Sequence, residues 1–312
     1  MSKWLVTGGC GFIGSHLVDA LLSRGDEVRV IDDLSSGKRE NVPAGVPVTV
    51  GDVADAKLIA DCMQDMDGCF HLAAVASVQR GNEDWLGTHR TNLTGTISVF
   101  DAARRCNPRG PVPVVYASSA AVYGDNPAIP LGEDAPIAPL SAYGSDKAGC
   151  ELHGRVAWHV HGVPNTGFRF FNVYGPRQDP KSPYSGVIAI FADRVAAGQT
   201  IDMHGDGRQV RDFVYVADVV RHLLAAMARP VPAARVFNVC TGRPTSILDL
   251  ARLLAEVANR PYHVAHKPAR VGDIRLSLGN PARAAEVFGF TADVGVADGL
   301  RQTFAALGKV EV

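Results

Sequence analysis

The sequence lacks the features that mark several broad classes of protein. Its formal net charge is −1 and no basic run stands out, so neither a nucleic acid nor an anionic membrane surface is expected as a partner. No stretch of about 18 apolar residues occurs, which predicts that the chain does not span a membrane. No basic and then apolar leader precedes residue 4, so we expect no signal peptide. These absences favour a cytoplasmic protein that binds a small molecule.

Close cysteine pairs are also absent. Without such pairs, neither a disulfide framework nor a zinc site is expected, and reduced thiols in a cytosol fit better. His71 has no partner at metal-ligand spacing and is interpreted as a packed core residue, so no metal site is predicted. The six cysteines are Cys10, Cys62, Cys69, Cys106, Cys150 and Cys240.

The chain is long and apolar enough to bury a full core. It has 312 residues, of which 46% are hydrophobic and 20% charged, so it forms one large unit or two fused domains. Predicted strands alternate with predicted helices, which indicates an α/β fold with a Rossmann-type, doubly wound parallel sheet. The strands are expected at 4–6, 27–31, 46–50, 68–74 and 114–119, and the helices at 15–24, 57–63, 83–106 and 142–162.

A glycine-rich turn follows the first predicted strand. Gly8, Gly11 and Gly14 permit a tight turn, close approach to a pyrophosphate and close packing of helix on strand, and the helix amino end supplies free N–H groups. Asp32 ends the next strand, near the spacing at which a carboxylate accepts hydrogen bonds from the adenosine ribose of NAD. A carboxylate there would repel a 2′-phosphate, so NAD is predicted rather than NADP.

Tyr143 and Lys147 begin the predicted helix 142–162. Residues four apart share a helix face, so the Lys147 ammonium is expected to stabilise the Tyr143 phenolate and make it a candidate base. The strand 114–119 ends in Ser118 and Ser119, which places hydroxyls at the carboxyl edge of the sheet, where α/β folds bind ligands. Asn92, on the preceding helix, is either a buried cap or a brace for the tyrosine, and the sequence leaves both open.

Together these motifs resemble the extended short-chain dehydrogenase/reductases, and among them the nucleotide-sugar epimerases, over essentially the whole chain. The resemblance implies tightly bound NAD, a UDP-sugar substrate and Ser119, Tyr143 and Lys147 as catalytic residues. It implies NAD contacts from Gly8, Gly11, Phe12, Ile13, Gly14, Asp32, Asp52, Val53, Leu72, Ala73, Ala74, Asn92, Ser118, Tyr143, Lys147 and Phe170. It implies substrate contacts from Ser119, Asn172, Val187, His204, Arg211, Arg270, Asp273 and Ser277.

Within that family the residues after the serines distinguish reactions. Sugar 4,6-dehydratases carry an Asp-Glu pair there, and decarboxylating enzymes carry a Glu, whereas this chain has Ala120 and Ala121. The resemblance therefore implies 4-epimerisation, because a 4-keto intermediate without an added acid or base can only be reduced again. Uronate 4-epimerases typically have Thr and Arg where this chain has Asn172 and Asp179. A UDP-glucuronate 4-epimerase, and a nucleotide-sugar dehydrogenase or reductase that exchanges NAD, remain alternatives.

Two domains are predicted. Residues 1–171 are expected to bind NAD, with a returning segment at about 210–240, in which 210–227 and 236–240 rejoin the sheet as helix and strand. Residues 172–312 are expected to form a smaller substrate lobe. In the family, the counterparts of helices 83–106 and 142–162 form a four-helix bundle between subunits, so a homodimer is expected by analogy.

Overall fold

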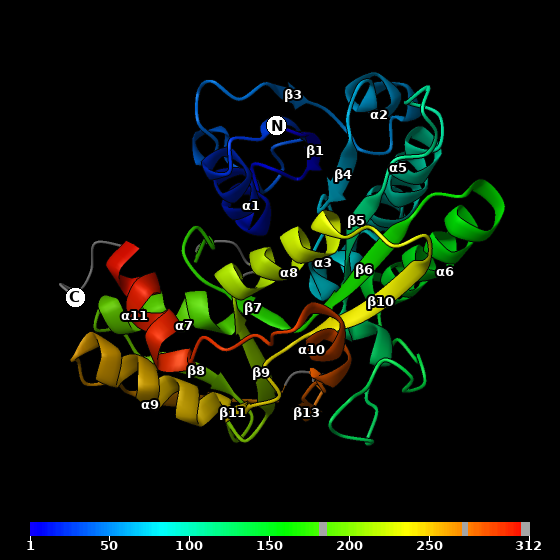
Figure 1. The fold of residues 1–312 in the computed structure, drawn as a ribbon. Helices are drawn as coiled ribbons and strands as arrows, with labels where there is room; N and C mark the ends of the chain where they lie inside the picture. The colour runs from blue at the N-terminus through cyan, green and yellow to red at the C-terminus, as the bar shows by residue number, and fades with distance from the viewer. Residues whose placement is uncertain (181–185, 270–273, 307–312) are drawn as a thin grey trace. The chain divides into compact units, whose positions relative to one another are not determined.

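The computed structural model describes residues 1–180, 186–269 and 274–306. The chain divides into two compact units, and Figure 1 labels most of their helices and strands. Unit 1 consists of Met1–Val122, Pro139–Arg169 and Val220–Phe237. Unit 2 consists of Tyr123–Ala138, Phe170–Val219 and Asn238–Val312.

Unit 1 is built on a seven-stranded sheet in the order β10-β6-β5-β4-β1-β2-β3. The pairs from β3 through β2, β1 and β4 to β5 are parallel. This order reverses between β1 and β4, which confirms the predicted Rossmann-type, doubly wound sheet. The strands are β1 (Lys3–Thr7), β2 (Glu27–Asp32), β3 (Val48–Val50), β4 (Gly68–His71), β5 (Val114–Ser119), β6 (Asn165–Phe170) and β10 (Ala234–Val239).

Helices cover both faces of this sheet. Neighbouring residues of β6 point to opposite faces: the Phe168 ring meets the His222 ring of α8 at 6.1 Å, while Arg169 reaches Glu151 of α6. Figure 1 shows α5 and α6 side by side behind the strands and α8 in front of them. The helices are α1 (Phe12–Ser23), α2 (Ala56–Met63), α3 (Val78–Glu83), α4 (Trp85–His89), α5 (Gly95–Ala103), α6 (Ala142–His161) and α8 (Val216–Ala228).

The long helix predicted over 83–106 is present over residues 85–103, but one turn within it departs from α-helical hydrogen bonding. A π-helical turn at Arg90–Thr94 separates α4 from α5. The turn carries Asn92 inward, where its amide accepts a hydrogen bond from Val75 N at 2.8 Å and donates to Val75 O at 3.3 Å. Such turns insert a residue into a helix and recur at functional sites.

Unit 2 is organised around β9 (Val210–Tyr215), which pairs with three short strands, β7 (Asn172–Tyr174), β11 (Pro244–Ser246) and β13 (Leu276–Ser277). A separate pair joins β8 (Ile201–His204) to β12 (Val264–Lys267). The helix predicted over 210–227 is wrong in its first part, because residues 210–215 form strand β9 in the sheet of unit 2. Helix α8 from Val220 and strand β10 do return to unit 1. The helices are α7 (Val187–Ala196), α9 (Ile247–Ala258), α10 (Ala282–Phe288) and α11 (Val296–Ala306).

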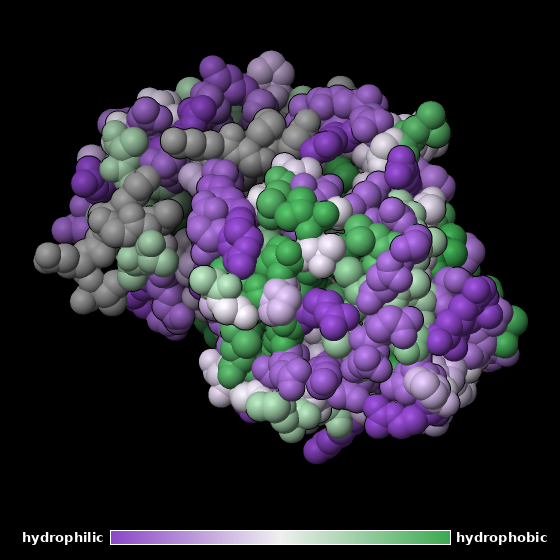
Figure 2. All heavy atoms as spheres, turned by 90° about the horizontal axis from the view of Figure 1, so that it is seen from above, coloured by the Kyte–Doolittle hydropathy of each residue, from purple (hydrophilic) through white to green (hydrophobic). Residues whose placement is uncertain are grey.

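Some large hydrophobic side chains reach the surface. Figure 2 shows patches of hydrophobic residues among hydrophilic ones on one face of the molecule.

Among the described residues, none of the helices is both long and apolar enough to cross a membrane. All six cysteines are buried and carry free thiols.

Candidate functional site

The glycine turn predicted to bind phosphate joins β1 to α1 and has no room for side chains. Gly8 has φ +70°, and a Cβ there would lie 2.7 Å from Ala73 N. A Cβ on Gly14 would overlap the carbonyl oxygen of Gly8. The backbone of the turn therefore contacts the backbone at the end of β4 and at the start of α1. Because the turn carries no side chains, a ligand can approach its backbone closely.

A buried polar network supports this turn from below. Thr7 Oγ1 lies 2.8 Å from His71 Nδ1 and accepts hydrogen bonds from Leu72 N and Ala73 N, both at 3.2 Å. These bonds turn the chain out of the strand, so β4 ends at His71 rather than at residue 74 as the sequence suggests. His71 Nε2 lies 2.9 Å from Thr96 Oγ1. Burial, with the charge of Lys147, lowers the pKa of His71 to about 3, so the ring is neutral and structural.

Asp32 ends β2 beside the glycine turn. Its carboxylate accepts hydrogen bonds from Cys10 N and Leu34 N, both at 2.9 Å. Burial raises the pKa of this carboxyl group, while the two backbone N–H groups act in the opposite direction. A bare glycine turn followed by a carboxylate at the end of β2 is the arrangement that NAD requires, so the residues present fit this cofactor.

Further predicted NAD residues of unit 1 lie at the start of α1, after β3, after β4 and in the π-helical turn. Asp52 forms an ion pair with Arg90 at 3.0 Å, and Val53 packs where Gly95 has no side chain. Asn92 braces Val75 in the segment after β4, so neither alternative suggested by the sequence describes its contacts. Phe12 and Ile13 begin α1, and Leu72, Ala73 and Ala74 follow β4. Their contacts with NAD stay predictions, as does that of Phe170, which belongs to unit 2.

The candidate catalytic residues lie at the start of α6 and the end of β5, both in unit 1. Lys147 is buried, its Nζ lies 5.9 Å from the centre of the Tyr143 ring, and it donates to Ala117 O at 2.9 Å. Ser119 Oγ accepts a hydrogen bond from Ala121 N at 3.1 Å. The structure thus puts the predicted tyrosine and lysine together on one helix face, which packs on the strand that ends in Ser119.

The contact that Ser118 makes was not predicted from the sequence. Its hydroxyl donates to Glu151 Oε1 at 2.5 Å, and Glu151 also pairs with Arg169. Two features of the sequence could have indicated this contact. Glu151 follows Lys147 by one helical turn, and Arg169 stands between Phe168 and Phe170 in an apolar strand. Binding of NAD by Ser118 stays a prediction.

Three of the predicted substrate residues of unit 2 gather around β9. Arg211 on β9 and Ser277 on β13 are paired in register, and Asn172 on β7 pairs with Phe213 of β9. The Asn172 amide also donates to Asp212 O at 3.3 Å. Segments that lie more than a hundred positions apart in the sequence therefore meet on one sheet.

Asp212 holds this sheet together and was not predicted as a site residue. Its buried carboxylate accepts hydrogen bonds from Thr241 N at 2.8 Å, Thr241 Oγ1 at 2.7 Å, Gly242 N at 2.9 Å and Gly279 N at 3.3 Å. Burial raises the pKa of Asp212, and these donors lower it. The carboxylate fixes the segment after β13 relative to β9, and so Ser277 relative to Arg211.

The remaining predicted substrate residues are less closely associated. Val187 begins α7, and His204 ends β8, where its Nδ1 lies 3.2 Å from Pro268 O. Arg270 and Asp273 lie outside the described residues. Within the described part of the chain, no group of three or more metal-ligating side chains occurs.

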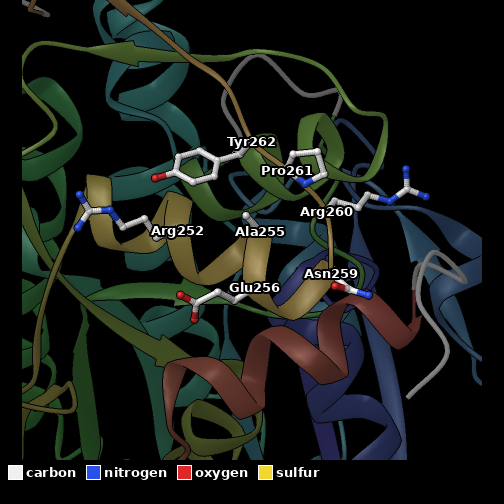
Figure 3. Close-up of a pocket in the computed structure, with 7 residues that line it drawn as sticks. All are labelled: Arg252, Ala255, Glu256, Asn259, Arg260, Pro261 and Tyr262. Carbon is white, nitrogen blue, oxygen red and sulfur yellow. The ribbon is translucent and has the colours of Figure 1, made fainter.

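A surface hollow of about 430 Å³ on unit 2 contains none of the predicted residues. Figure 3 shows that its arginines point away from each other, with Arg252 on α9 and Arg260 in the segment after it. Because these polar groups do not converge, the hollow is a poor candidate for a site.

Comparison with known proteins agrees with this geometry. The chain is 38% identical to the UDP-glucose 4-epimerase of Mycolicibacterium smegmatis, over 96% of this chain and 97% of that one. The solved structure of Thermotoga maritima UDP-glucose 4-epimerase with UDP-glucose superposes with a TM-score of 0.93 at 36% identity, covering 98% and 99% of the two chains.

A UDP-N-acetylglucosamine 4-epimerase from Methanobrevibacter ruminantium, solved with UDP-N-acetylmuramic acid, superposes with a TM-score of 0.92 at 34% identity, covering 98% of each chain. The model of the NAD dependent epimerase/dehydratase family matches residues 4–240. The protein is therefore an enzyme of the NAD dependent epimerase/dehydratase family, with NAD as its cofactor.

Proposed function

We propose that this enzyme interconverts the epimers of a UDP-hexose at carbon 4 and accepts both UDP-N-acetylglucosamine and UDP-glucose. The observation that carries the proposal is the placement of Tyr143 and Lys147 on one face of α6, packed on the strand that ends in Ser119. The names of the similar proteins, which are 4-epimerases of UDP-sugars, support it.

Each catalytic side chain has a distinct task in this reaction. The Tyr143 phenolate takes the proton of the 4-hydroxyl, and the Lys147 ammonium stabilises that phenolate. The Ser119 hydroxyl hydrogen-bonds the same substrate oxygen. Bound NAD would supply a reversible hydride acceptor for carbon 4 of the sugar. Gly8, Gly11, Gly14 and Asp32 would hold the cofactor throughout, so that it is not consumed.

The residues after Ser119 favour epimerisation over elimination. The turn Ala120–Tyr123 offers two methyl groups, Ala120 and Ala121, where elimination needs a proton donor and acceptor. A 4-keto sugar held there would meet these methyl groups in place of the acid and base that water loss requires. It can rotate and be reduced on its other face, which inverts carbon 4.

The substrate preference rests on unit 2. Arg211 supplies a guanidinium group suited to a diphosphate, and its register partner Ser277 is small. A serine next to carbon 2 of the sugar leaves room for an acetamido group, so the N-acetyl sugar is accepted.

The test is to incubate purified protein separately with UDP-glucose, UDP-N-acetylglucosamine and UDP-glucuronate, and to identify the products by NMR. The expected products are UDP-galactose and UDP-N-acetylgalactosamine. UDP-galacturonate as the sole product would instead identify a uronate epimerase, and a change at a carbon other than 4 would exclude the proposed reaction.

The proposed assembly is a homodimer. Leu152, Val156 and Val160 are spaced four apart on α6 and are 61%, 46% and 68% exposed, and Ile97 of the neighbouring α5 is 38% exposed. A second copy of the same helices would cover this apolar stripe. Sedimentation analysis should give a dimer that Val156→Glu disrupts. A monomeric wild type would contradict the assignment.

A further inference from the structure

A buried ion pair lies directly behind the candidate catalytic residues. Arg169 Nε donates to Glu151 Oε1 at 2.9 Å and Arg169 Nη2 donates to Glu151 Oε2 at 2.7 Å. The two side chains are only 5% and 6% exposed. The Ser118 hydroxyl donates a third hydrogen bond to the carboxylate, at 2.5 Å. Two parallel bonds from a guanidinium fix the orientation of a carboxylate as well as its charge.

The pair is linked to Lys147 through both α6 and β5. Glu151 follows Lys147 by four residues and Tyr143 by eight, so the three side chains share one helix face. On the facing strand, Ala117 O accepts the hydrogen bond of Lys147, and the next residue, Ser118, bonds Glu151. Two successive turns of α6 are thus attached to two successive residues of β5.

The electrostatic consequence concerns the charge that Tyr143 experiences. An unpaired Glu151 carboxylate, one turn from Lys147, would be costly to bury and would attract the lysine ammonium away from the tyrosine. Arg169 neutralises it, and Lys147 is left as the cation beside Tyr143.

The other titratable groups packed around this face are the same in wild type and in the variants that test the pair. Burial keeps His71 neutral, with a pKa of about 3, and raises the pKa values of Tyr116 and Cys150, which stay protonated. Asp146 is paired with His89 at 2.8 Å.

We infer that Glu151 and Arg169 are positioning residues of the proposed reaction: with Ser118 they hold Lys147 against β5 and cancel a charge that would otherwise oppose ionisation of Tyr143. The inference goes beyond the proposed function but rests on it, because it takes Tyr143 as the base. Because both side chains are almost fully buried against each other, we assign them an action through Lys147 and Tyr143.

Two single variants change the charge behind Tyr143 in opposite directions. Arg169→Met leaves a buried negative charge, which disfavours the phenolate, so the acid limb of kcat against pH should move to higher pH. Glu151→Gln leaves a buried positive charge, so the limb should move to lower pH. Eight residues of helix span about 12 Å, and at that separation one charge shifts the limb by roughly one pH unit.

A second readout does not depend on turnover. The ultraviolet absorbance of tyrosinate is titrated in each variant and in its Tyr143→Phe counterpart, and the difference reports Tyr143 alone. The same opposite displacements should appear. The neutral double variant Glu151→Gln/Arg169→Met and the charge-conserving Arg169→Lys should both return toward the wild-type curve. Arg155→Met, the same change at an exposed position one turn further along α6, is the matched control and should not shift it.

A purely structural pair predicts a different pattern. If both single variants shift in the same direction or not at all, or if the double variant stays as displaced as the singles, the inference is overturned. Should Arg169→Met fail to fold, Glu151→Gln, the double variant and Arg169→Lys still decide it. Tyr143→Phe distinguishes failure of the proposed function from failure of the inference. Near-normal turnover in Tyr143→Phe overturns the proposed function itself. Lost turnover in Tyr143→Phe, without opposite shifts in the Glu151 and Arg169 variants, overturns only the inference.

Discussion

Ser277 and Arg211 are register partners on the parallel strands β13 and β9. One carries a small side chain and the other a guanidinium, so a diphosphate held by the arginine would place its sugar beside the serine. This relationship makes residue 277 the position at which the size of the sugar substituent can be tested most directly.

Ser277→Tyr should reduce activity toward UDP-N-acetylglucosamine by about 10- to 100-fold relative to UDP-glucose, because the ring fills the space that the acetamido group needs. The measurement is kcat/KM for both substrates, with Ser277→Ala as the size-conserving control. Equal loss of both activities in the tyrosine variant would show that residue 277 does not discriminate between them.

Gly144→Ala tests how closely α6 must approach the turn Ala120–Tyr123, which follows β5. A Cβ at position 144 would lie 2.7 Å from the carbonyl oxygen of Ala121, so the start of α6 must move and carry Tyr143 with it. We expect kcat to fall at least about tenfold, because small misplacements of a catalytic group are costly, while NAD stays bound. Gly45→Ala, at a position with nothing within 4 Å, is the control. An unchanged kcat in Gly144→Ala would argue against the close approach.

Asp212→Asn should weaken substrate binding without releasing NAD. The change presents an amide to the backbone N–H groups of Gly242 and Gly279, which loosens the segment after β13. We expect the KM for UDP-glucose to rise by about fivefold or more, since a loss of about 1 kcal/mol corresponds to that factor. Asp206→Asn, an exposed change in the same unit, is the control. Release of NAD with an unchanged KM would contradict this role.

His71 predicts the direction in which stability changes with pH. Its pKa is lowered from 6.5 to about 3 in the folded state, so below about pH 6.5 the unfolded chain binds a proton that the folded chain does not. Its contribution to the free energy of unfolding is therefore complete above pH 6.5 and is lost as the pH falls from there toward 3. Calorimetry between about pH 8 and about pH 4 should show a steeper fall in Tm for wild type than for His71→Gln. Parallel curves would exclude His71 as the source.

Local chemistry explains what could be predicted from the sequence. The bare turn at Gly8, Gly11 and Gly14 needs glycine for steric reasons, and the strand β5 lies at Val114–Ser119 as its apolar run indicates. Helix α6 begins at Ala142, just after its cap Ser141, so the spacing of Tyr143 and Lys147 translated directly into a shared face.

Contacts between distant segments could not be predicted in this way. The π-helical turn at Arg90–Thr94 depends on a hydrogen-bonded partner, Val75, that no periodicity reveals. The pairing of Glu151 with Arg169 joins a helix to a strand, and the position of Arg169 in an apolar strand does not reveal which residue is its partner. Strand β9 could be assigned to its sheet only once its partners β7, β11 and β13 were known.

The central claim is that carbon 4 is transiently oxidised and then reduced by the same bound cofactor. It is tested most directly with UDP-N-acetylglucosamine carrying deuterium at carbon 4, incubated with the purified enzyme without added NAD. The account predicts UDP-N-acetylgalactosamine with the deuterium still on carbon 4, and no NADH in solution. Loss of the deuterium to solvent, or NADH formed in proportion to product, would contradict it.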